Sequence, residues 1–399
     1  MTARKRWIAV LWAVSAAGCG AKSGLEVPDA VAPDALCVEV PADGGTVPLD
    51  LQTNARLVSA DVVFLIDTSS SMGREIAAIR SGIRERLAPA FQAEIPDVAI
   101  GVAEFVDFPV RPHGGPNDIP FAQLQPVTTD LRRVQEAVDQ IELRNGLDEP
   151  ESQVEALYQL ATGEGLGAYV PPALACPKDH VAYPCFRPSA LHVVLLFTDQ
   201  EFHNDSVGGN PYQSIIVPGP HSYDDAVAAL AEHDIRVIGF ESGGGAGLRD
   251  LTRLAMDTGA VDGAGEALVF DIGVNGGALD TRVVDAMKRV ANDSLFDVLA
   301  TVRDPSPDDG IDVTAFVESV MPVSASPAEG VQGIEEDRFL GVSPGTELSY
   351  RIVLRPNSVP AKAEAQVFPI EIVFSSGEGA GLGVRLINLV IPALDGTGC

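Results

Sequence analysis

Strand-like and helix-like segments alternate between residues 59 and 293, and this alternation restricts the fold more than any other feature. The runs VVFLI (62–66) and HVVLLF (192–197) are continuously apolar, as in strands buried on both faces. The segments 72–91 and 223–234 instead place apolar residues at helical spacing. Helices between such strands cover both faces of a parallel sheet. The sequence therefore predicts an α/β domain with a doubly wound parallel sheet over residues 59–293.

The helical pattern stops after residue 293, and strand-like segments separated by turn residues follow. Residues 294–399 are therefore predicted to form an antiparallel β-sandwich. Residues 37–58 also alternate apolar and polar side chains and are predicted to pair with this sandwich. Because β segments flank the α/β region on both sides, we expect it to be inserted into the sandwich. A separate tail domain is the alternative.

The N-terminus has the features of an export signal. A basic start, RKR, precedes a short apolar run and small residues that lead to Cys19. The sequence AAGC resembles a bacterial lipobox, which makes residues 1–18 a signal peptide and Cys19 the lipidated first residue of the mature protein. Ordinary signal cleavage is the alternative. Gly20 after the cysteine favours the outer membrane, by resemblance to enteric sorting, and residues 19–36 are predicted to be a tether.

Four cysteines remain if Cys19 carries lipid, and an even number suits disulfides in an oxidising compartment. Three pairings are conceivable. Cys176 and Cys185 bracket a short Pro-containing loop, which favours a local disulfide. Cys37 and Cys399 lie at the two ends of the predicted folded part, and their pairing would close it.

The overall charge is strongly negative. Asp and Glu number 56 against 27 Lys and Arg, so the formal net charge is -29. Nucleic acid and anionic lipid repel such a surface, so neither is expected as the main partner. We expect contact with the membrane through the lipid anchor only.

Polar side chains gather at three places where strands or loops reach the carboxyl edge of the predicted sheet, which is where open parallel sheets bind ligands. Taken alone, the group Asp67, Ser69 and Ser71 is explained equally well as a helix cap. Carboxylates that converge on one point repel each other unless a cation lies among them, and hydroxyl and carboxylate oxygens suit Mg²⁺, Mn²⁺ or Ca²⁺. The three groups are Asp67, Ser69 and Ser71; Asp148, Glu149 and Glu151; and Asp199.

The pattern Asp-x-Ser-x-Ser after the first strand, followed by an acidic loop and a strand ending in Thr-Asp, resembles the metal-ion-dependent adhesion site (MIDAS) of von Willebrand factor A (VWA) domains. The loop DEPES is similar to that of integrin β-subunits, which implies Glu151 as a metal ligand. The same resemblance implies a second cation site at Asp148, the Pro150 carbonyl and Asn145. The resemblance implies Mg²⁺ first, with Ca²⁺ or Mn²⁺ as alternatives.

The function expected is that of a cell-envelope lipoprotein whose VWA domain binds a protein or glycan ligand with an acidic group through a divalent cation. An envelope assembly scaffold with a structural cation is the alternative. A metal-assisted hydrolase would need a base, for which Glu149, Glu201 and His203 are the nearby residues; since nothing in the sequence selects one, a non-enzyme is expected. His203 is expected to be a solvent-facing loop residue.

Overall fold

A computed structural model describes residues 36–40, 48–306, 311–356, 359–377 and 379–399. The predicted signal peptide 1–18, the predicted lipidation site Cys19 and the predicted tether up to residue 35 lie outside the described residues. Within the described part of the chain, no helix combines the length and the apolar character needed to cross a membrane.

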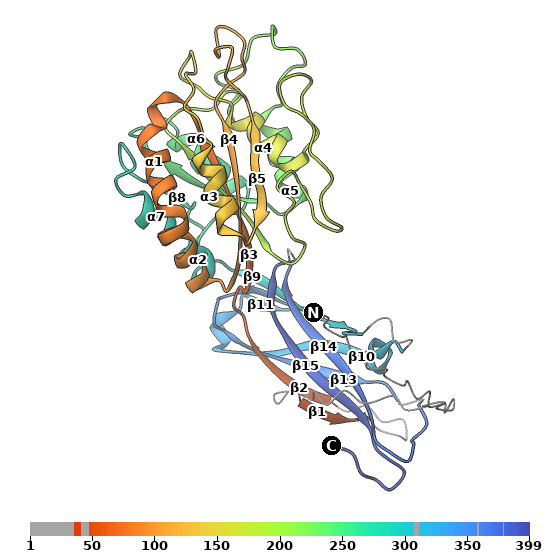
Figure 1. Ribbon diagram of the computed structural model, residues 1–399. Coiled ribbons are helices and arrows are strands. Elements are labelled where there is room, and N and C mark those ends of the chain that lie inside the picture. The colour runs from red at the N-terminus through yellow and green to blue at the C-terminus, as the bar shows by residue number, and fades with distance from the viewer. Residues whose placement is uncertain (1–35, 41–47, 307–310, 357–358, 378) are drawn as a thin grey trace, which may run out of the picture. The chain divides into compact units, whose positions relative to one another are not determined.

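The α/β region is built on a six-stranded sheet (Figure 1). All nine residues of its central strand β3 are buried, which explains why the sequence there is apolar without alternation. The strands, in chain order, are β3 (Ser59–Asp67), β4 (Asp97–Phe105), β5 (Ala122–Thr128), β6 (Leu191–Thr198), β7 (Arg236–Glu241) and β8 (Val269–Asp271).

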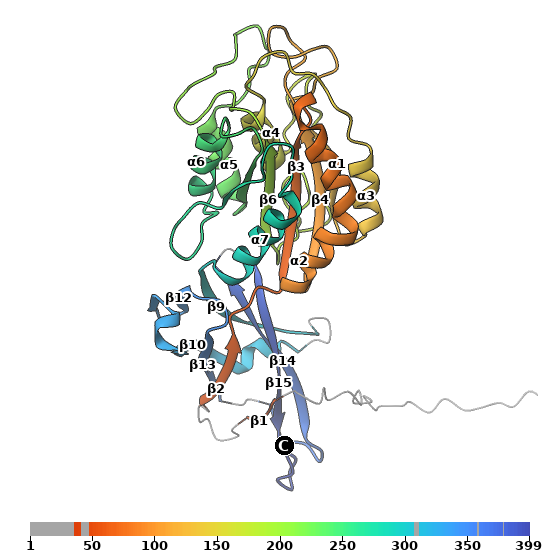
Figure 2. The ribbon, with the colours of Figure 1, turned by 90° about the vertical axis from the view of Figure 1, so that its left-hand side faces the viewer.

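Helices cover both faces of this sheet (Figures 1 and 2). Phe64 of β3 packs in one hydrophobic cluster with residues of α1, α2, α3 and α7, and Val63 packs in a second with residues of α4, α5 and α6. A short π-helical segment, Ile83–Leu87, joins α1 to α2. The helices are α1 (Gly73–Gly82), α2 (Ala88–Glu94), α3 (Leu131–Asp139), α4 (Gln153–Thr162), α5 (Tyr223–Glu232), α6 (Leu248–Asp257) and α7 (Leu279–Asn292).

The strand order is β5-β4-β3-β6-β7-β8. From β3 the chain passes to β4 on one side and later returns to β6 on the other, so the strand order reverses between β3 and β6. Open α/β sheets bind ligands in the crevice outside such a reversal. The parallel register aligns Ile66 with Phe197, which brings the carboxyl ends of the two strands together.

The sheet differs from the prediction at one edge. Strand β5 runs antiparallel to β4, so the sheet is mixed and not wholly parallel. The strand, AQLQPVT, is half-buried, mixes apolar and polar residues and contains a proline, as an edge strand allows. The sequence pattern does not predict a strand there.

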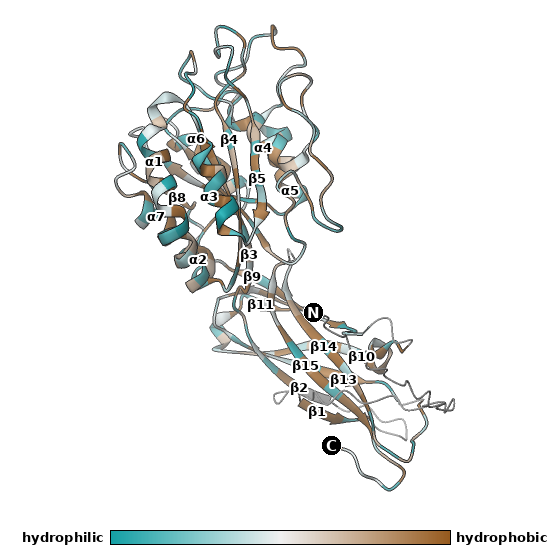
Figure 3. Ribbon diagram, in the orientation of Figure 1, coloured by the Kyte–Doolittle hydropathy of each residue, from teal (hydrophilic) through white to brown (hydrophobic). Residues whose placement is uncertain are grey.

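The C-terminal region contains two further β-sheets, in which β14 and β15 carry apolar stretches (Figure 3). Strands β1 and β2, which precede the α/β region, pair with β15 and β13. One sheet has the order β1-β15-β14-β9-β12-β11 and the other β10-β13-β2. Their bounds are β1 (Leu36–Glu39), β2 (Pro48–Asn54), β9 (Phe296–Arg303), β10 (Val317–Ser326), β11 (Gly333–Ile334), β12 (Arg338–Val342), β13 (Glu347–Leu354), β14 (Gln366–Ser376) and β15 (Gly381–Ile391).

Residues Val313–Phe316, within the region predicted to be strand-like, form a 3₁₀ helix instead. The side chain of Asp312 accepts a hydrogen bond from the Thr314 amide and caps this turn.

Both predicted disulfides are confirmed: Cys37 is bonded to Cys399, and Cys176 is bonded to Cys185.

Candidate metal centre

The five predicted metal ligands lie at the carboxyl edge of the sheet, around the ends of β3 and β6. Asp67 is the last residue of β3, and the two serines follow it in the turn that leads to α1. Asp199 directly follows β6, and Glu151 lies two residues before α4. The ligand set therefore comes from three segments that are far apart in the sequence. These residues are Asp67, Ser69, Ser71, Glu151 and Asp199.

Asp67 is held by hydrogen bonds to both of its carboxylate oxygens. The Ser69 amide donates to Oδ1 at 2.8 Å, and the Thr198 hydroxyl donates to Oδ2 at 2.8 Å. The carboxyl group is completely buried, and burial together with the negative charge of Asp199 raises its pKa to about 7. Asp67 is thus an orienting residue at the centre of the predicted site.

The two serines lie close together at the surface end of the site. The Oγ atoms of Ser69 and Ser71 are 3.1 Å apart, and Ser71 is exposed while Ser69 is buried. Burial raises the pKa of Asp199, and a hydrogen bond from the Ser71 hydroxyl opposes that rise. Ser69 makes no side-chain capping bond to the short 3₁₀ helix Ser70–Met72, and Met72 precedes α1 as its N-cap. The helix-cap explanation of this motif is therefore wrong.

Glu151 is buried at the same edge and is fixed through its backbone. Its amide donates to the Glu201 carbonyl at 3.1 Å, and its carbonyl accepts from the His203 amide at 2.9 Å. Burial, with the charge of Asp67 next in size, raises the pKa of Glu151 to about 12. Gly146 leaves room for the carboxyl group, because a Cβ there would stand 2.6 Å from Oε1 of Glu151.

The donor set fits a hard divalent cation. Oε2 of Glu151 and Oδ1 of Asp199 are buried, and neither has a hydrogen-bond partner among the described residues. Unpaired buried carboxylate oxygens are costly, and a cation bound to either oxygen would remove that cost for it. Carboxylate and hydroxyl oxygens are the ligands that Mg²⁺, Ca²⁺ and Mn²⁺ prefer.

The glycine-rich loop after β7 packs against the backbone of Asp199, a contact that was not predicted from the sequence. A Cβ at Gly243 would lie 2.0 Å from the carbonyl oxygen of Asp199, so the backbones approach too closely for any other residue. The carboxylate of Glu241, the last residue of β7, accepts from the amides of Gly243 and Gly245, each at 2.9 Å. The signal in the sequence was a run of glycines directly after a strand.

The residues of the predicted second cation site have different surroundings. Asn145 is exposed, and Asp148 faces two histidine side chains. His203 is 3 % exposed, so the expectation of a solvent-facing histidine was wrong. Asp107, His113, Asp148 and His203 place ligand atoms that all lie within 4.8 Å of one another, and we call these four residues the His/Asp cluster.

Sequence reasoning missed two members of the His/Asp cluster. Asp107 lies two residues after the end of β4, at the same carboxyl edge as Asp67 and Asp199, so the strand-end argument would have found it. His113 lies in the loop between β4 and β5 and carries no sequence pattern that distinguishes it from the other histidines.

No protein-family model matches the sequence, and no curated protein matches it. Among solved structures, a von Willebrand factor type A protein from Catenulispora acidiphila is 12% identical with a TM-score of 0.39, covering 90% of this chain and 72% of that one. The pilus adhesin SpaC from Lactobacillus rhamnosus GG is 11% identical with a TM-score of 0.35, covering 87% of this chain and 45% of that one. Proximal thread matrix protein 1 from the mussel byssus is 13% identical with a TM-score of 0.34, covering 63% of this chain and 51% of that one.

Proposed function

We propose that this chain is an exported, lipid-anchored envelope protein of the VWA class. Its α/β domain binds a divalent cation, Mg²⁺ first, through Ser69, Ser71 and Glu151, with Asp67 and Asp199 acting through water. The cation binds an acidic group on a protein or glycan ligand. The C-terminal β region is a sandwich into which the α/β domain is inserted, and the pairing of β1 and β2 with strands from the other end of the chain supports this arrangement.

The observation that carries the proposal lies where the strand order reverses. Thr198, at the end of β6, donates a hydrogen bond to Asp67, at the end of β3, while Glu151 and Asp199 each keep a buried carboxylate oxygen without a hydrogen bond. When bound, the cation would coordinate an anionic oxygen of the ligand at an open coordination position. The exposure of Ser71 supports an opening toward solvent on that side.

The scaffold alternative requires a covered cation, so the exposed Ser71 favours ligand capture. The hydrolase alternative requires a free base beside the cation. His203 instead makes its contacts within the His/Asp cluster, and Glu201 accepts a hydrogen bond from Asn210 at 3.1 Å. Because two of the three bases named from the sequence are engaged in these contacts, we propose a binding role without catalysis.

Calorimetric titration with Mg²⁺ tests the cation site directly. The wild-type protein is expected to bind one Mg²⁺ at the site, and Asp67→Asn is expected to lose this binding while its circular dichroism spectrum stays unchanged. Asp179→Asn is the matched control, because Asp179 is an exposed loop residue with a positive φ that Asn tolerates. Equal Mg²⁺ binding by wild type and Asp67→Asn would remove the cation from the proposal.

Pull-down from envelope extract then tests the ligand role. Proteins or glycans retained in Mg²⁺, released by EDTA and not retained by Asp67→Asn are the expected result. A retained set that is identical with and without EDTA would contradict cation-dependent capture.

A further inference from the structure

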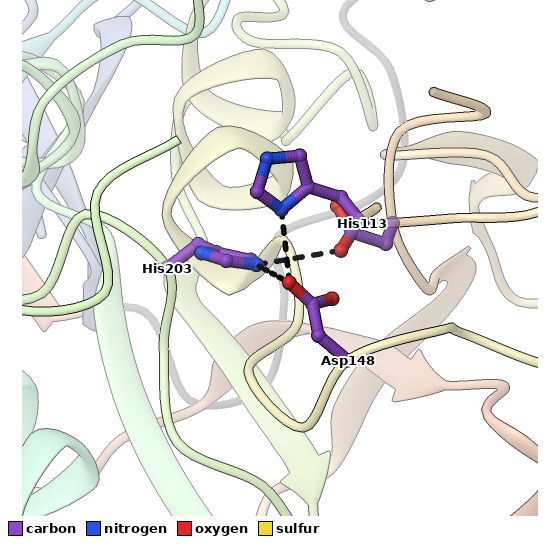
Figure 4. A group of neighbouring side chains, drawn as sticks. His113, Asp148 and His203 are labelled. Carbon is purple, nitrogen blue, oxygen red and sulfur yellow. Dashed lines mark hydrogen bonds and ion pairs between the residues drawn. The ribbon is translucent and has the colours of Figure 1, made fainter. Parts of the chain in front are cut away.

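The His/Asp cluster joins three loops beside the predicted Mg²⁺ site. Asp107 and His113 come from the loop after β4, Asp148 from the loop before α4, and His203 from the loop after β6. Figure 4 shows the side chains of His113, Asp148 and His203 pointing toward one another. The side chains of the two histidines are only 4 % exposed, and that of Asp148 is 30 % exposed.

Asp107 presents one carboxylate oxygen to the cluster. Its Oδ1 accepts hydrogen bonds from the Phe108 amide and the Tyr212 hydroxyl, both at 2.6 Å. Its Oδ2 is buried and makes no hydrogen bond with any described residue. The oxygen that is left unpaired is the one that faces His203, at 3.5 Å from Nε2.

His203 likewise directs one ring nitrogen, Nε2, into the cluster. Its Nδ1 lies 2.6 Å from the Asn210 carbonyl oxygen, to which only a protonated nitrogen can bond. In the neutral ring, Nε2 therefore carries the lone pair. This atom is buried without a hydrogen bond among the described residues and faces Oδ2 of Asp107 at 3.5 Å and Oδ2 of Asp148 at 3.4 Å. A lone pair facing two carboxylates is repelled unless a proton or a metal ion lies between them.

His113 is the fourth residue of the His/Asp cluster. Its Nδ1 lies 2.9 Å from Oδ2 of Asp148, and its Nε2 accepts from the Gln213 amide across 3.3 Å. A metal on Nδ1 moves the ring proton to Nε2 and breaks that long hydrogen bond, which is the cost of using His113 as a ligand. A carbonyl bond behind a ligating histidine, as at His203, is the usual arrangement in metal sites.

We propose that Asp107, His113, Asp148 and His203 bind a divalent transition-metal ion, Zn²⁺ in the first instance, at a closed four-ligand site. Ligand atoms about 2.1 Å from a tetrahedral zinc ion lie roughly 3.4 Å apart. The two distances from His203 Nε2 to the carboxylates, 3.4 and 3.5 Å, match that spacing. The 2.9 Å contact between His113 and Asp148 opens by about 0.5 Å to accommodate the ion.

The ligand chemistry separates this site from the predicted Mg²⁺ site. Two imidazoles with two carboxylates select zinc or a neighbouring transition metal, whereas Mg²⁺ and Ca²⁺ prefer oxygen ligands throughout. Two carboxylates also neutralise the charge of a divalent ion in a buried position. Four protein ligands leave no open position, so the metal has a structural role and ties the three loops together.

The test uses chelator-stripped full-length protein titrated with Zn²⁺ in an excess of Mg²⁺, which fills the other site. One Zn²⁺ per chain is expected, and Co²⁺ in its place is expected to give the strong visible absorption of a four-coordinate ion. His203→Gln and Asp148→Asn are expected to weaken Zn²⁺ binding on the order of 100-fold or more, since each removes a ligand. Asp148→Asn is the safer variant for folding because Asp148 is partly exposed.

Two controls separate this proposal from the proposed function. His180→Gln, which changes a histidine outside the cluster, and Asp67→Asn are both expected to retain Zn²⁺ with wild-type affinity. If wild type takes up no Zn²⁺, or if Asp148→Asn binds it as wild type does, the cluster is a proton-held His–Asp network and the proposal is overturned.

Discussion

The hydroxyl of Thr198 donates a 2.8 Å hydrogen bond to Oδ2 of Asp67, linking two residues that are 131 positions apart in the sequence. The same hydroxyl oxygen accepts from the Gln153 side chain at 3.0 Å and from the Gln200 amide at 3.2 Å. Thr198 therefore connects the ends of β3 and β6 with the first residue of α4. This connection positions the centre of the candidate site.

Thr198→Val keeps the shape of the side chain and removes all three hydrogen bonds. Because the completely buried Asp67 loses the hydrogen bond to its Oδ2, we expect a loss of about 1–3 kcal/mol in the free energy of unfolding. Urea denaturation followed by circular dichroism measures it. Thr252→Val is the control, since that half-buried hydroxyl bonds the Leu248 carbonyl of its own helix and no other group among the described residues, and a change within about 0.5 kcal/mol is expected. Equal losses in the two variants would contradict the role given to Thr198.

Gly146→Ala tests the position of Glu151. Gly146 has φ +57°, and an added Cβ would lie 2.6 Å from Oε1 of the buried Glu151, which must then move. Gly208 has φ +73°, and an added Cβ there would meet no atom of the described residues within 4 Å, so Gly208→Ala carries the backbone strain alone. Both variants are expected to lose about 1 kcal/mol of stability. Only Gly146→Ala is expected to weaken Mg²⁺ binding, by roughly tenfold in calorimetric titration; unchanged Mg²⁺ affinity in it would argue against Glu151 as a ligand.

Arg187 compensates a fully buried carboxylate near the start of β3. Its Nε and its backbone amide donate to the two oxygens of Asp61 at 2.7 and 2.6 Å. Arg187→Gln leaves Asp61 buried without its charge partner, so a loss of about 3–5 kcal/mol in the free energy of unfolding is expected. Arg303→Gln breaks an exposed pair with Glu371 and is expected to cost less than about 1 kcal/mol. Thermal and urea unfolding measure both, and similar losses would show that burial of Asp61 is not the cause.

The stability of the metal-free protein is expected to fall as the pH rises. Burial and the charge of Asp199 raise the pKa of Asp67 from 3.8 to about 7. Burial lowers the pKa of His203, but the carboxylates of Asp107 and Asp148 that face its ring outweigh burial and raise the pKa from 6.5 to about 9. In both cases the folded state holds the proton more tightly than the unfolded state. The stabilisation is complete below the unfolded pKa and is lost as the pH passes the folded value.

Differential scanning calorimetry in EDTA between about pH 5 and pH 9 measures this dependence, and Tm is expected to decrease across the range. Adding Mg²⁺ and Zn²⁺ at the alkaline end is expected to restore it, because the cations replace the lost protons. A Tm that rises with pH in EDTA would contradict the assigned environments of Asp67 and His203.

Much of the architecture could be predicted because it depends on local patterns. The apolar run in β3 and the helical spacing in α1 follow from burial and periodicity, and the loop between Cys176 and Cys185 is short enough to favour their disulfide. Strand β5 could not be predicted in this way. It is half-buried at a sheet edge, so its sequence has neither a continuous apolar run nor a clean alternation.

For the candidate site, the sequence by itself determined that Ser69 and Ser71 follow a buried strand ending in Asp67, and that Asp199 stands at the end of another apolar run. Only the tertiary structure decided that Thr198 bonds Asp67, that Gly243 packs on the Asp199 carbonyl, and that His203 is buried against Asp107 and Asp148. The physical reason is that hydrophobic periodicity is a local property of the chain. Which loops meet at the edge of a sheet depends on strand order, and that order is set by the packing of the whole domain.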